Sequence, residues 1–126
     1  MEALKSAIVT RANSRAIVNL EPAVLDAWTV LCESGPVLEL GEIRITPDIW
    51  QLVPRNIVWM AVDLHEVGYF GDVCDETWAR NEQSLNTSGS ILSAWKPSSA
   101  PGFCVLTERL PHGPNTEVFI GLDYVC

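Results

Sequence analysis

Short apolar runs separated by turn residues dominate the last third of the chain. Three of these runs are rich in β-branched and aromatic residues, as strands are: 91–95, 103–107 and 118–124. Loops that contain proline and glycine join them at 97–102 and 111–114. Because consecutive strands with short connections pair in opposite directions, these runs predict a three-stranded antiparallel meander.

The middle of the chain has helical spacing instead. Residues 55–67 are apolar almost all round and are followed by Gly68, a pattern that predicts a buried central helix. A second and more polar helix is expected from Asp75 to the stop at 86–89, with Trp78 on its inner face.

Two other segments also predict helical structure. Residues 21–32 repeat apolar positions at helical spacing, with a proline in the first turn and Gly35 just beyond the end. The tripeptide Thr46-Pro47-Asp48 places a capping hydroxyl before a proline, which is typical of the start of a short helical turn.

The remaining apolar clusters suit hairpins. Clusters at 7–10 and 16–18 predict one hairpin, and a helix over 4–11 is the competing interpretation. Apolar and polar residues alternate over 37–45 on either side of a turn at Gly41, which predicts a second hairpin.

Together these segments predict one α+β domain that spans residues 1–126. We expect an antiparallel sheet of about four to six strands, with the meander at its C-terminal end, packed against about three helices. Apolar residues make up 48% of the 126, enough for a compact core, and no internal repeat divides the chain.

The charge of the chain limits its partners. Sixteen acidic and eight basic residues give a net charge of −8, which repels nucleic-acid phosphates and acidic membranes. We therefore expect no direct nucleic-acid binding and no membrane binding. The charge favours a basic protein partner, five tryptophans could anchor a protein surface, and a homodimer formed through a sheet edge is a second option.

No apolar run reaches the roughly 20 residues that cross a bilayer. The first residues also lack the hydrophobic stretch of a signal peptide, so we expect a cytoplasmic location.

The sequence contains no motif for a cofactor or a metal. Phosphate-binding loops, dinucleotide fingerprints, the hydrolase elbow and helical zinc motifs are all missing, so we expect no cofactor and no metal. The four cysteines are scattered, and a chain with this much core does not need cross-links. An even count of four is compatible with two disulfides, but the interpretation we favour is four reduced thiols: Cys32, Cys74, Cys104 and Cys126.

From about residue 45 to residue 124 the chain carries an ordered set of landmarks. They are Thr46-Pro47, His65, Gly68-Tyr69-Phe70-Gly71-Asp72, Ile91-Leu92-Ser93-Ala94-Trp95 and Val105-Leu106-Thr107-Glu108. This order resembles a group of small bacterial proteins carried on plasmids, integron cassettes and other mobile elements. The group has no established activity, so the resemblance implies an accessory role on a mobile element and no particular chemistry. Tyr69 stands where the group has an aspartate.

The side chains best suited to chemistry gather around the loop after the central helix. In a functional interpretation, His65 and Asp72 form an acid/base pair or contact a ligand, and Tyr69 offers a hydroxyl or a stacking face. In a structural interpretation, His65 lies near a helix dipole and Phe70 fills the core. We expect a binding site to be drawn from His65, Tyr69, Phe70, Asp72, Trp95 and Glu108.

Two functions are consistent with these features. The first is a non-enzymatic binding or regulatory module for a protein partner, which the acidity and the lack of catalytic motifs favour. The second is a small enzyme or small-molecule-binding domain with a pocket near His65, Tyr69, Phe70 and Asp72.

Overall fold

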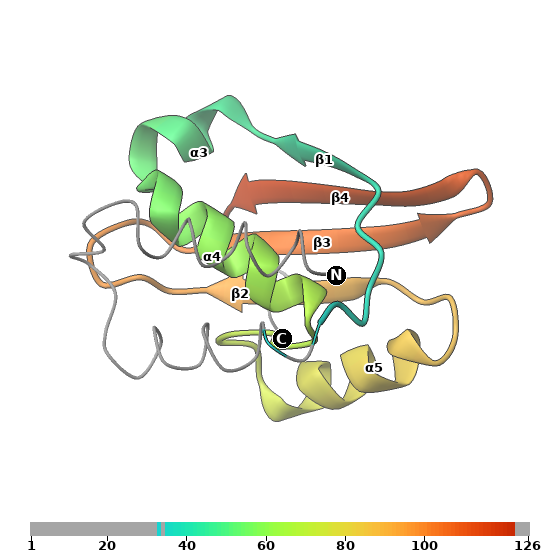
Figure 1. Ribbon diagram of the computed structural model, residues 1–126. Coiled ribbons are helices and arrows are strands. Elements are labelled where there is room, and N and C mark those ends of the chain that lie inside the picture. Colours follow the sequence, from blue (N-terminus) through green and yellow to red (C-terminus); the bar gives the residue numbers. More distant parts are fainter. Residues whose placement is uncertain (1–32, 34, 123–126) are drawn as a thin grey trace.

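The computed structural model describes residues 33 and 35–122, and these form a four-stranded sheet with three helices. The strands lie in the order β1-β4-β3-β2. In Figure 1, α4 lies in front of the sheet and α5 lies below β2. The predicted α+β class is confirmed. The elements are β1 (Glu42–Ile45), α3 (Pro47–Leu52), α4 (Arg55–Glu66), α5 (Asp75–Leu85), β2 (Ile91–Trp95), β3 (Phe103–Leu110) and β4 (Gly113–Ile120).

The predicted meander is confirmed, although its last strand starts earlier than expected. Strands β2, β3 and β4 pair antiparallel, and β4 begins at Gly113 rather than at residue 118. The sequence pattern assigned Pro114 to a loop because proline lacks a ladder donor. Here Pro114 pairs with Arg109 of β3, and on its other side β1 extends only as far as Asn115. The proline therefore interrupts no strand pairing.

The hairpin predicted over 37–45 is wrong. Only β1 forms a strand, and it pairs parallel to β4, so the sheet is mixed. The N–H groups of Val37 and Leu38 donate instead to the carbonyl oxygen of Glu66 at the end of α4, over 2.9 and 3.2 Å. The alternation that resembled a hairpin arises because Leu38 and Leu40 are buried in the core.

The helices of the described region match their predicted positions closely. The short turn after Thr46 is α3, and the central helix is α4, which is followed by Gly68 at a φ of 88°. The polar helix is α5. The predicted hairpin and helices within residues 1–32 lie outside the described residues.

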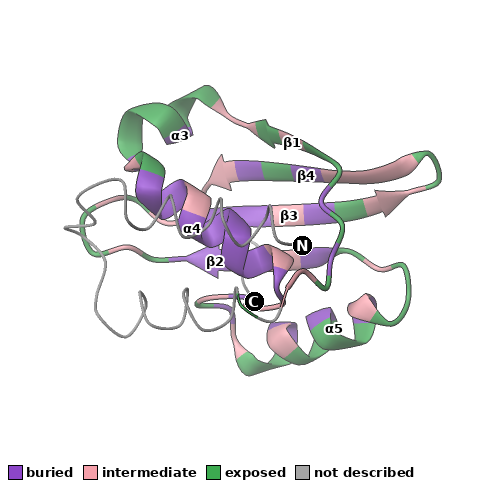
Figure 2. Ribbon diagram, in the orientation of Figure 1, coloured by how far each residue is buried: buried purple, intermediate pink, exposed green. Residues whose placement is uncertain are grey.

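The core lies between α4 and the facing side of the sheet. Figure 2 shows that α4 is buried along most of its length and that α5 is exposed on its outer side. Val58 and Ala61 of α4 have no exposed surface, and neither do Val105 and Val118 of the sheet. This burial explains why the central helix is apolar almost all round.

Side chains and a neighbouring loop cover the outer edge of β2. Asn81 of α5 donates to the carbonyl oxygen of Leu92 and accepts from its N–H, over 2.7 and 3.1 Å. The N–H of Ala94 donates to the Phe70 carbonyl oxygen, and the Ala94 carbonyl oxygen accepts from the backbone N–H of Asp72. This edge is therefore closed to another strand.

We expect Gly41→Ala to destabilise the fold more than Gly35→Ala does. Both glycines have positive φ, 63° and 84°, so each alanine bears a similar backbone cost of about 1 kcal/mol. A Cβ at Gly41 would also overlap the carbonyl oxygen of Pro114, whereas nothing lies within 4 Å of one at Gly35. Urea unfolding should show an additional loss of about 1–3 kcal/mol for Gly41→Ala. Equal losses would contradict the close approach of Gly41 to β4.

Candidate functional site

The structure brings together four of the six residues that the sequence singled out. The rings of His65 and Phe70 lie 6.4 Å apart, and those of Tyr69 and Trp95 lie 6.3 Å apart. Trp78 of α5 joins the pairs, with its ring 5.1 Å from Phe70 and 5.3 Å from Tyr69. His65 and Phe70 have no exposed surface and Trp95 has 5%. The cluster is part of the packed core, and only Tyr69 among the four is half-buried.

A chain of buried hydrogen bonds passes through His65. Its Nδ1 lies 2.7 Å from the hydroxyl of Ser93 on β2, and its Nε2 lies 2.9 Å from the hydroxyl of Thr107 on β3. The hydroxyl of Thr107 in turn lies 2.7 Å from the hydroxyl of Thr116 on β4. The chain joins α4 to three neighbouring strands through side chains alone.

The two ends of this chain fix the direction of every proton in it. At one end the hydroxyl of Thr116 donates to the carbonyl oxygen of Leu40, so it can only accept from Thr107. The hydroxyl of Thr107 therefore donates its only proton to Thr116, and it must accept from Nε2–H of His65. At the other end Nε1–H of Trp95 donates to Ser93 over 2.9 Å, and Ser93 donates to Nδ1. We therefore assign a neutral His65 that carries its proton on Nε2.

The electrostatics of the site agree with this assignment. Complete burial lowers the pKa of His65 from 6.5 to about 3, because the charged imidazolium would lose its hydration. A histidine that is neutral throughout the physiological range, with both nitrogens occupied, has no free position for a substrate or a metal. The geometry therefore gives His65 a structural role, which is to hold a buried hydrogen-bond network and not to place a charge near a helix dipole.

The other two candidate residues lie apart from His65. Asp72 is exposed, and its carboxylate accepts from the backbone N–H of Lys96 over 2.8 Å, just beyond the end of β2. Glu108 is exposed on the sheet face that points away from α4. The structure therefore does not bring His65 and Asp72 together as an acid/base pair.

Sequence reasoning missed three residues of this hydrogen-bond network: Ser93, Thr107 and Thr116. Each is polar at a buried strand position where alternation predicts an apolar side chain. A polar residue on the buried face of a strand needs an internal partner, and a histidine in an otherwise apolar helix is such a partner. Polar residues at buried strand positions, together with a histidine in an apolar helix, were therefore the sequence signal from which the hydrogen-bond network could have been predicted.

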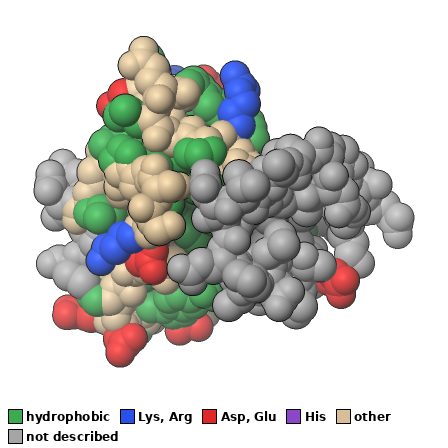
Figure 3. All heavy atoms as spheres, turned by 90° about the vertical axis from the view of Figure 1, so that its left-hand side faces the viewer, with side chains coloured by type: hydrophobic (Ala, Val, Ile, Leu, Met, Phe, Trp, Pro, Cys, Tyr) green, Lys and Arg blue, Asp and Glu red, His purple; other side chains and the backbone are tan. Residues whose placement is uncertain are grey.

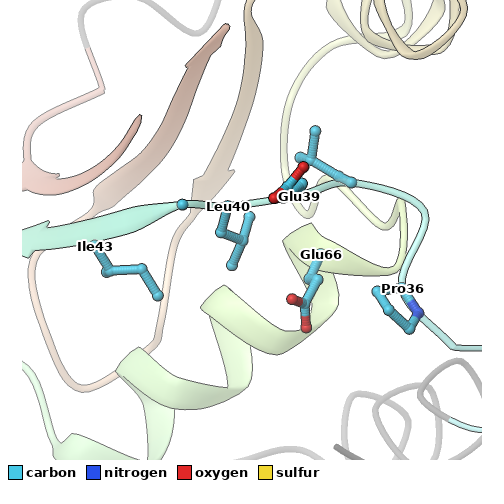
Figure 4. A pocket seen from close by; sticks show the side chains of 7 residues that line it. Pro36, Glu39, Leu40, Ile43 and Glu66 are labelled. Carbon is cyan, nitrogen blue, oxygen red and sulfur yellow. The ribbon is translucent and has the colours of Figure 1, made fainter. Parts of the chain in front are cut away.

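A pocket of about 440 Å³ lies elsewhere, between the end of α4 and the segment before β1. Figure 4 shows the side chains of Leu40 and Ile43 extending toward α4, with Glu66 at the end of that helix. Its lining is Pro36, Leu38, Glu39, Leu40, Gly41, Ile43 and Glu66. The wall is mainly apolar with two carboxylates, and none of the six candidate residues contributes to it.

The second face of the sheet carries a different combination of side chains. None of the three described helices covers this face, which we call the helix-free face. Leu92 and Leu106 are half-buried on it, and strand pairing sets Leu106 beside the exposed Glu117. Glu108 and Glu42 lie on the same face and are also exposed. Apolar surface and carboxylates therefore adjoin there.

The cysteines only partly follow the expectation of reduced thiols. Cys104 is a free, buried thiol. Cys74 is disulfide-bonded, and the expectation is wrong at this residue.

Comparison with known proteins identifies no relative. No family model, no curated protein and no solved structure matches the chain. Within residues 33 and 35–122, no three histidine, cysteine or acidic side chains are grouped so that they could hold a metal ion. No helix of that region has the length and apolar character needed to cross a membrane.

We expect His65 to make folding stability depend on pH. The unfolded chain takes up a proton at this residue below about pH 6.5, whereas the folded chain resists protonation down to about pH 3. The stabilisation is therefore complete above pH 6.5 and is lost as the pH falls toward 3. The slope of this contribution approaches about 1.4 kcal/mol per pH unit.

Urea unfolding between pH 4.5 and pH 7.5 measures this slope. His65→Gln should reduce it, and His112→Gln, which removes an exposed histidine, should not. Nitrogen NMR gives a second measurement, since the two ring nitrogens of His65 should stay inequivalent across this range. Titration of His65 near pH 6.5 would contradict the neutral assignment.

Proposed function

We propose that the protein is a non-enzymatic binding or regulatory module that recognises a basic protein partner through the helix-free face. The observation that carries the proposal is the presence of exposed carboxylates, Glu108 and Glu117, beside the half-buried Leu92 and Leu106. Apolar area of this kind supplies affinity, and surrounding charges select the partner and steer its approach. The resemblance to mobile-element proteins fits an accessory role of this type.

The overall charge supports the same proposal. The chain has a net charge of −8, and exposed carboxylates extend over more than one element. Figure 3 shows that on one face of the molecule acidic side chains gather mainly toward the bottom of the view, next to hydrophobic side chains, while basic side chains lie farther up. A basic partner would be attracted from beyond contact distance, and salt would weaken that attraction.

The alternative, a small enzyme or small-molecule-binding domain, loses its support around His65. His65 and Phe70 are completely buried, so a ligand could reach them only if the core opened. Small-molecule binding retains one observation, the pocket before β1. Its apolar wall and two carboxylates would suit a ligand that has an apolar body and a cationic group.

The double variant Glu108→Gln/Glu117→Gln tests the proposed surface. We expect it to weaken binding of a partner captured from a bacterial lysate at low salt by about tenfold. The matched control is Glu76→Gln/Glu82→Gln, which removes the same charge from exposed positions on α5. Binding can be measured by titration at 50 mM and 300 mM salt.

The two variants separate surface recognition from net charge. If both weaken binding equally, total charge is responsible and the helix-free face is not the site. Binding that is unchanged in the Glu108/Glu117 variant and insensitive to salt would overturn the proposal.

A further inference from the structure

Among the described residues, β1 forms an open edge of the sheet, in contrast to the covered edge at β2. The N–H of Thr46 donates to the carbonyl oxygen of Val118 in β4, so the backbone of Thr46 faces that strand. Backbone groups alternate in direction along a strand, so those of Ile43 and Ile45 point away from the sheet. Within the described residues, no strand lies beyond β1. Ile43 and Ile45 thus present a ready-made pairing edge.

The side chains of β1 carry a charge pattern suited to self-recognition. Glu42 and Arg44 lie two residues apart, on the same face, with their charged groups 3.3 Å from each other. Their side chains are 70% and 63% exposed, so both are available to a neighbouring strand. One strand therefore presents a negative and a positive charge on either side of Ile43.

We propose that two copies of this chain pair through β1, antiparallel, about a twofold axis at Ile43. In this register Glu42 of each copy lies opposite Arg44 of the other, so the interface contains two symmetric pairs of opposite charge. The outward N–H and C=O groups of Ile43 bond to those of its counterpart. Each copy adds four strands, and the two sheets become one.

Charge and hydrogen-bond geometry select this register. Moving the axis by one residue to Arg44 would set the two arginines directly opposite each other, which is unfavourable. It would also leave Glu42 facing Thr46. With the axis at Ile43, the half-buried isoleucines of both copies lie on the same side of the joined sheet as the α4 helices, and they extend the apolar layer there.

This dimer goes beyond the proposed function and does not depend on it. It uses the edge of the sheet, whereas the proposed partner binds the helix-free face. A Glu108→Gln variant that weakens partner binding should leave dimerisation unchanged, because Glu108 lies on β3, two strands away from β1.

Charge reversal at Glu42 and Arg44 provides the test. Sedimentation equilibrium of the full chain, up to about 1 mM because a short interface binds weakly, should show a dimer. Glu42→Arg alone and Arg44→Glu alone should each weaken dimerisation at least tenfold, because like charges then face each other. Mixing the two single variants should restore pairing as a heterodimer, and the double variant E42R/R44E should restore the homodimer.

A backbone variant tests the hydrogen bonds separately from the charges. Ile43→Pro removes an outward N–H and should abolish the dimer, whereas Ile43→Ala shortens the same side chain and should retain part of it. Glu82→Arg on α5 is the matched charge reversal and should have no effect. A wild-type chain that stays monomeric at 1 mM overturns the proposal, and so does a mixture of the single variants that forms no heterodimer.

Discussion

The neutral imidazole of His65 is the interaction on which the rest of the described structure depends. A helix and a sheet pack through apolar contacts that tolerate sliding, but hydrogen bonds fix a single relative position. Here one side chain of α4 contacts hydroxyls on β2 and β3, and Thr116 extends the connection through β4 to Leu40. Every proton in this chain has one possible direction. The same arrangement that orients the core therefore removes His65 from acid/base chemistry at neutral pH.

The two edges of the sheet differ, and the difference follows from where the chain returns after α4. The loop after α4 runs beside β2, where backbone groups and the Asp72 carboxylate satisfy the outward groups of Ala94 and Lys96. Asn81 of α5 serves Leu92 in the same way. Nothing comparable covers β1 among the described residues, because the segment before it turns toward α4. In the described part of the chain one edge is closed and the other is open, and the pairing that we propose uses the open edge.

The sequence predicted elements well where one local signal determined them. The apolar surface of α4 and the proline before α3 were sufficient, as was the run of strand residues in β2. Prediction failed where tertiary pairing decided between two local options. Residues 37–45 alternate as a hairpin would, yet β1 pairs with β4, more than 70 residues later in the chain. A periodic pattern reports that one face is buried and does not report which strand lies alongside.

The candidate site illustrates the same limit for function. His65, Phe70 and Trp95 were singled out because their side chains suit binding or catalysis. In the structure all three belong to the core, where His65 and Trp95 form buried hydrogen bonds with Ser93. A histidine in an apolar helix is either a functional residue or a structural one. Here the inward-facing Ser93 and Thr107 bond to both ring nitrogens, which identifies His65 as structural. Glu108 had the weaker chemical signal, yet it lies on exposed surface beside apolar groups. In the binding module that we propose, the residues that would contact a partner are those that the core does not use.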